Sequence, residues 1–214
     1  MSLRRRDGIV VAASAAAAVV VASAITGSAL APSSPSFVEL APVVAAWPDS
    51  YDVRGTKAEP LYTELIHVAR DGDRFEVTID VRGQGDAELG TQHGAVHVDH
   101  DGGITWTDGC GKSAALCADD IALRGFLATA AVLGLSRDGR LPAVGELREL
   151  HGTPVICIDD EALHPDAGAA AVALDPCFER SSGAVVAHWS PDSAAFVGAT
   201  LADGFTVTTG TPSS

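Results

Sequence analysis

Basic side chains are scarce in this chain of 214 residues, which contains 14 Lys and Arg against 28 Asp and Glu. Three of the basic residues and one acidic residue lie within the first 31 residues, so the remainder carries 11 basic and 27 acidic side chains. Its net charge is about −16. A surface this acidic repels phosphate backbones and anionic headgroups. The composition therefore disfavours nucleic acid as a partner.

Cysteine is absent before Cys110, so the leader lacks the cysteine that a lipoprotein would carry, and lipid anchoring is excluded. Four cysteines follow, at positions 110, 117, 157 and 177. Close C-x2-C pairs, typical of zinc sites, are lacking. In an oxidising compartment the even number predicts two disulfides, with three pairings open. Sequence proximity favours Cys110 with Cys117, and Cys157 with Cys177 across two neighbouring strands.

Motifs for catalysis and for phosphate binding are also lacking. The segment Gly134–Gly139 has one residue too many for the G-x-S-x-G nucleophile turn and follows a helical pattern. Gly83-Gln84-Gly85 precedes acidic residues, which would repel an anion. We therefore predict a protein that is not an enzyme and needs no cofactor.

The histidine-rich segment 93–101 resembles a metal site in composition only. His93, His97 and His100 lie close in sequence to Asp99 and Asp101, and imidazole and carboxylate are common ligands of divalent ions. On a strand only alternate residues share a face, so His97 and Asp99 project together and His100 points away. We predict solvated strand and turn residues, and no metal site.

Charge is absent from Gly8 to Val38, directly after Arg4, Arg5 and Arg6. The apolar centre, residues 9–25, is rich in Ala and Val and predicts a secretory signal or a single membrane anchor helix. A small-x-small cleavage pattern ends at Ala31 but is followed by Pro32, and residues 22–24 and 27–29 offer other sites, so both readings stay open. In either case the positive-inside rule places the C-terminal part outside the cytoplasm, membrane-anchored or secreted.

The predicted organisation is a signal peptide or membrane anchor at 1–31, a linker at 32–46 and an extracytoplasmic domain at 47–214. About 170 residues are enough for one domain with a real core. Residues 74–82 alternate cleanly, with apolar Phe75, Val77, Ile79 and Val81 on one face, which predicts a half-buried antiparallel strand. Similar patterns and turn residues predict strands at 61–70, 95–99, 104–107, 146–151, 154–159, 170–174, 184–189, 194–201 and 205–208.

One helix interrupts the strands. Asp119 or Asp120 can cap it, residues 121–135 are apolar on almost every side, and Gly134 or Gly139 can end it. A helix this apolar must be buried against the sheet. We expect an α+β fold in which one long curved antiparallel sheet wraps around one main buried helix.

Several segments together resemble the LolA/LppX-like carriers of bacterial envelopes. They are the leader, the hairpin 70–75, the strand end Gly103-Ile104-Thr105-Trp106, and the segments 152–157 and 177–186. The resemblance implies a half-barrel sheet whose concave face accepts a lipid or another hydrophobic ligand. The missing lipobox cysteine departs from the lipoprotein members.

The candidate ligand-cavity residues are the large apolar side chains that a curved sheet would turn toward the helix: Phe75, Val77, Ile79, Trp106, Phe126, Leu127 and Trp189. The same residues would also suit a dry core. Two hypotheses follow. The domain binds a lipid or other hydrophobic ligand without catalysis, or it is a membrane-tethered accessory subunit that docks a larger membrane protein complex of the envelope.

Overall fold

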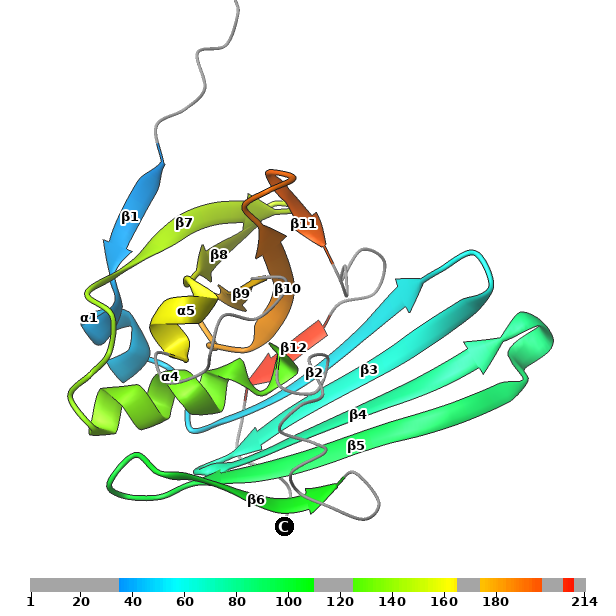
Figure 1. Ribbon diagram of the computed structural model, residues 1–214, viewed down its shortest axis with the longest axis horizontal. Coiled ribbons are helices and arrows are strands. Elements are labelled where there is room, and N and C mark those ends of the chain that lie inside the picture. The colour runs from blue at the N-terminus through cyan, green and yellow to red at the C-terminus, as the bar shows by residue number, and fades with distance from the viewer. Residues whose placement is uncertain (1–34, 110–124, 165–173, 198–205, 210–214) are drawn as a thin grey trace, which may run out of the picture. The chain divides into compact units, whose positions relative to one another are not determined.

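The computed structural model describes residues 35–109, 125–164, 174–197 and 206–209 (Figure 1). The chain divides into two compact units, residues 1–34 and residues 35–214. The predicted signal or anchor lies in the first unit, outside the described residues.

The described strands form two antiparallel sheets of six strands each. Sheet A contains, in spatial order, β1 (Ser36–Glu39), β7 (Val144–Leu150), β8 (Thr153–Cys157), β9 (Asp175–Glu179), β10 (Val185–Ser190) and β11 (Ala195–Val197). Sheet B contains β12 (Thr206–Thr209), β2 (Ser50–Ala58), β3 (Tyr62–Asp71), β4 (Arg74–Gly83), β5 (Glu88–Val98) and β6 (Ile104–Gly109). The α+β class is confirmed.

Helices are few in the described part of the chain. They are α1 (Leu40–Ala45), a short 3₁₀ turn η1 (Gln84–Asp86), α4 (Ala128–Arg137) and α5 (Asp160–Leu163). The predicted main helix is α4, and Gly139 just beyond its end has a left-handed backbone with φ of 70°. Glycine tolerates this conformation, so Gly139 rather than Gly134 ends the helix. The expected caps, Asp119 and Asp120, lie outside the described residues.

Two sheets, rather than one long sheet, are the main difference from the expectation. After α4 the chain does not return to the edge strand β6. Strands β7 to β11 pair with one another and with β1, whereas β12 returns to pair with β2. Alternation shows which residues of a strand share a face but not which strand lies beside it. β1 and α1 also fall within residues 32–46, the range expected to be a linker.

The individual strands of sheet B agree closely with the sequence pattern. β3 and β4 pair over their whole length, from Asp71 opposite Arg74 to Tyr62 opposite Gly83. Buried and partly buried side chains alternate over residues 66–70 of β3 and 75–80 of β4. β2 was not expected, and β5 begins at Glu88 rather than at residue 95. We call the face of sheet B that carries Phe75, Val77 and Ile79 its inner face.

One hydrophobic core includes buried residues from both sheets and from α4. Thr129, on the first turn of α4, connects the two sheets through its hydroxyl group. Its Oγ1 accepts a hydrogen bond from the Tyr51 hydroxyl of β2 at 3.2 Å and donates one to the Gly183 carbonyl, before β10, at 2.6 Å. Burial raises the pKa of Tyr51 to about 12. The helix therefore holds the two sheets by a buried polar contact as well as by apolar packing.

Candidate functional site

The predicted ligand-cavity residues of β4 lie on the inner face of sheet B. Phe75, Val77 and Ile79 are each at least 98% buried. Cross-strand neighbours Val68 and Val96 flank them and are also buried. At this end of the sheet the inner face is a packed core surface.

Phe126, Leu127 and Trp106 belong to the same core. Phe126 and Leu127 are buried immediately before the first residue of α4, and the Phe126 ring meets the His188 imidazole edge-on at 5.7 Å between ring centroids. Trp106, on β6 opposite Val96, is partly buried against the core. The structure thus brings these three side chains and the three from β4 into one cluster.

Trp189 lies on β10 of sheet A and is partly buried against the same core. The guanidinium carbon of Arg148 lies 3.4 Å from the centroid of its ring, and Phe196 packs edge-on against it at 5.1 Å. Trp189 therefore takes part in a cation–π stack of sheet A and shares no sheet with Phe75.

The inner face of sheet B continues beyond the core, toward the turns that join β2 to β3 and β4 to β5. The exposed Gln92 lies opposite buried Ile79 and marks the place where the core stops covering the inner face. Figure 1 shows the long strands running side by side to this end, on the right. We call it the distal end, made of residues 56–65 and 80–91.

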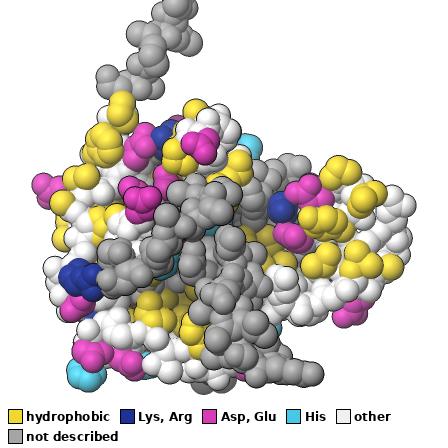
Figure 2. Space-filling view, in the orientation of Figure 1, with side chains coloured by type: hydrophobic (Ala, Val, Ile, Leu, Met, Phe, Trp, Pro, Cys, Tyr) yellow, Lys and Arg dark blue, Asp and Glu magenta, His cyan; other side chains and the backbone are white. Residues whose placement is uncertain are grey.

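Four apolar side chains gather at the distal end, and we call them the distal patch: Leu61, Tyr62, Val81 and Leu89. Leu61 is 71% exposed and Leu89 62% exposed, whereas Tyr62 and Val81 are partly buried. In Figure 2 apolar side chains gather around basic and acidic groups at this end. An exposed apolar surface of this kind is typical of a binding site.

A β-bulge brings Leu89 to the inner face. Val81 pairs with Gly90 and Arg82 with Glu88, so Leu89 is the extra residue on β5. Gly83 gives it room, because a Cβ at position 83 would lie 3.2 Å from Leu89 Cδ1. Gly83 is also the direct partner of Tyr62. The missing side chain thus lets Leu89 lie over the sheet beside Tyr62.

Three charged side chains accompany the distal patch. Lys57 on β2 is opposite Glu64 on β3, and by alternation both belong to the inner face. Lys57 Nζ lies 3.1 Å from Glu59 Oε1 and 3.6 Å from Glu64 Oε2. The Lys57 and Glu64 side chains are each only 22% exposed. We call Lys57, Glu59 and Glu64 the charged trio, and its net charge is negative.

The histidines of β5 lie on the outer face of sheet B and are paired with carboxylates. His93 Nε2 is 3.0 Å from Glu76 Oε1, and His97 Nε2 is 3.9 Å from Asp99 Oδ1. Within the described ranges no three His, Cys, Asp or Glu side chains converge on a point where they could hold a metal ion.

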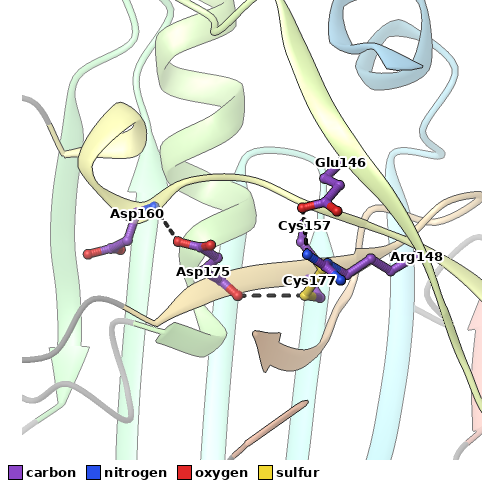
Figure 3. The surroundings of a disulfide bond; sticks show 6 residues. All are labelled: Glu146, Arg148, Cys157, Asp160, Asp175 and Cys177. Carbon is purple, nitrogen blue, oxygen red and sulfur yellow. Dashed lines mark hydrogen bonds and ion pairs between the residues drawn. A yellow bond between two sulfur atoms is a disulfide. The ribbon is translucent and has the colours of Figure 1, made fainter. Parts of the chain in front are cut away.

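A second polar cluster lies near the disulfide (Figure 3). The predicted bond between Cys157 and Cys177 is present and joins directly opposite residues of β8 and β9. Beside it, Asp175 Oδ1 accepts a hydrogen bond from the backbone N–H of Asp160 at 3.2 Å. Burial, with the charges of Asp159 and Asp160, raises the pKa of Asp175. These carboxylates hold the start of α5, where Asp160 Oδ1 also lies 3.0 Å from His164 Nδ1.

The other two cysteines, Cys110 and Cys117, lie outside the described residues. The disulfide that the structure does contain is consistent with an oxidising, extracytoplasmic location. Among the helices of the described ranges, none has both the length and the hydrophobicity needed to cross a bilayer.

No protein-family model matches the chain, and no significant match to it occurs among curated proteins or solved structures. The resemblance to the envelope carriers therefore stays a prediction.

The sequence pattern missed Lys57, Leu61 and Leu89. β2 does alternate, with Tyr51 and Val53 on the inner face, but Gly55 and Lys57 replace apolar residues at its distal end. Near Leu89 the sequence contains only the turn-like residues 83–87. They predict that the chain reverses there, but they do not predict the bulge that places Leu89 on the inner face.

Proposed function

We propose that this protein is a non-catalytic cell-envelope domain that binds a lipid or other hydrophobic ligand on the inner face of sheet B. One observation carries the proposal: the inner face runs from the buried row of Phe75, Val77 and Ile79 to the partly buried Tyr62 and Val81 and the exposed Leu89 of the distal patch. An acyl chain lying on this part of the inner face would cover Tyr62, Val81 and Leu89. Each buried methylene group would contribute about 0.8 kcal/mol.

The predicted leader and the resemblance to the LolA/LppX-like carriers support the same proposal. The disulfide between Cys157 and Cys177 agrees with a place outside the cytoplasm. We propose that the leader delivers the domain there, either as a membrane anchor or as a cleaved signal.

Sheet B offers a matched pair of leucines for the test. Leu89 lies on the inner face at 62% exposure, and Leu65 lies on the outer face at 43% exposure. Leu89→Asp should weaken binding of an uncharged fluorescent dye with a fatty chain by roughly tenfold or more, because it places a charge under the apolar chain. Leu65→Asp should leave dye binding within about twofold of the parent.

Equal effects of the two substitutions, or no dye binding by the parent, would contradict the proposal. Mass spectrometry of lipids that co-purify with the native protein would identify the natural ligand. The exposed leucines would also suit the alternative, docking of a larger membrane complex. That alternative is favoured if Leu89→Asp releases a co-purifying membrane protein while the parent carries no lipid.

A further inference from the structure

The distal end of sheet B carries an excess of negative charge around its apolar side chains. Its basic residues are Lys57 and Arg82, and its acidic residues are Glu59, Glu64, Asp80, Asp86 and Glu88. Two positive and five negative charges leave a net charge of −3. Asp80 and Arg82 alternate with Val81 on β4 and lie on the outer face, so a ligand on the inner face meets chiefly the charged trio, which has one negative charge in excess.

Both basic groups of the distal end already have carboxylate partners. Lys57 contacts Glu59 and Glu64, and Arg82 Nη1 lies 3.8 Å from Glu88 Oε2. An anionic headgroup at Lys57 would have to displace a carboxylate and would still meet the second one. A cationic headgroup would instead meet the negative charge that the trio has in excess.

From this charge pattern we propose that the ligand of the distal patch is an amphiphile with a positively charged polar end, and that the site rejects anionic lipids. The inference rests on the proposed function and specifies its ligand class. The apolar chain would lie over Tyr62, Val81 and Leu89. The cationic end would lie beside Glu59, the more exposed acid of the charged trio at 35% exposure.

Three single-chain probes of equal length test this preference on the full chain: dodecyltrimethylammonium, monododecanoylglycerol and dodecanoate, each below its micelle concentration. Displacement of the fatty-chain dye would give their affinities. At low salt the cationic probe should bind roughly tenfold more tightly than dodecanoate, with the neutral probe between them. The difference should shrink toward high salt, because screening weakens interactions between exposed charges.

Variants that remove carboxylates test whether the charged trio causes the preference for the cationic probe. Glu59→Gln together with Glu64→Gln leaves Lys57 without its two carboxylates, so the order of the cationic and anionic probes should reverse. Asp138→Asn is the matched control, because Asp138 is an exposed carboxylate that follows α4 and lies near Gly102, at the other end of β5. This control should keep the order of the parent.

Dodecanoate binding as tightly as the cationic probe, or an unchanged order in the double variant, would overturn this inference while the proposed function stands. If none of the probes displaces the dye and Leu89→Asp leaves dye binding unaffected, the proposed function and this inference fail together.

Discussion

Replacing Thr129 by Val should cost far more stability than its small change in shape suggests. Valine has nearly the shape of threonine but cannot hydrogen bond. The substitution would leave the Tyr51 hydroxyl and the Gly183 carbonyl without the partner that each has now, at 3.2 and 2.6 Å. Thr129 is fully buried and Tyr51 is 3% exposed, so water does not replace the lost contact. Each unsatisfied buried group costs about 1 to 3 kcal/mol.

We therefore expect Thr129→Val to lower the free energy of unfolding by about 2 to 5 kcal/mol. Thr129→Ser is the control, because it keeps the hydroxyl and removes one methyl group, at a cost of about 1 kcal/mol. Tyr51→Phe removes only the donor to Thr129, and its cost should be about 1 kcal/mol.

Urea unfolding, followed by tryptophan fluorescence, measures these differences as shifts of the midpoint at constant slope. A double-mutant cycle of Tyr51→Phe with Thr129→Val isolates the contact between the two side chains. In the Tyr51→Phe background Thr129→Val should cost about 1 kcal/mol less, because no tyrosine hydroxyl is left without a hydrogen-bond partner. If Thr129→Val costs no more than Thr129→Ser, the buried hydroxyl does not connect the sheets as described.

Three other predictions concern stability. Burial lowers the pKa of His188 to about 4, below its usual 6.5, so the stability that the neutral imidazole contributes is fully present above pH 6.5 and is lost as the pH falls toward 4. Urea unfolding at several pH values should show that His188→Gln removes up to about 3 kcal/mol of this loss of stability in acid. Identical pH profiles of parent and variant would contradict this. Gly183→Ala should lower stability in thermal unfolding by about 2 to 4 kcal/mol, because the new Cβ would overlap the Trp47 indole. Gly139 has a similar positive φ but open space around it, so Gly139→Ala should cost about 1 kcal/mol. Equal losses would refute the overlap. Without its disulfide in sheet A the protein should lose about 3 kcal/mol, measured by urea unfolding of the Cys157→Ala and Cys177→Ala double variant, and an unchanged midpoint would show that the bond adds nothing.

Local structure was predictable wherever the sequence pattern was regular. Phe75, Val77 and Ile79 alternate with polar residues, so β4 and its buried face could be read directly from the chain. The pairing of Cys157 with Cys177 followed from short sequence separation between two strand patterns. In each case the interaction that decides the structure is local or involves near neighbours in the chain.

The candidate site was predictable only in its buried part. Leu89 reaches the inner face through a bulge and through the absence of a side chain at Gly83, and the alternation of apolar and polar residues predicts neither feature. Trp189 was predicted as a cavity residue but packs on Arg148 in sheet A. Its strand belongs to sheet A, and the sequence pattern did not show that the strands form two sheets.

The sequence by itself determined which residues are apolar, which faces of the strands they occupy, where the chain turns, and that the molecule is acidic. The tertiary structure alone decided that the strands divide into two sheets, that Thr129 connects them, and that apolar and acidic side chains meet at the distal end of sheet B. The physical reason is that periodicity fixes the direction of a side chain relative to its own strand. Which other strand or helix it meets depends on contacts between residues far apart in the chain.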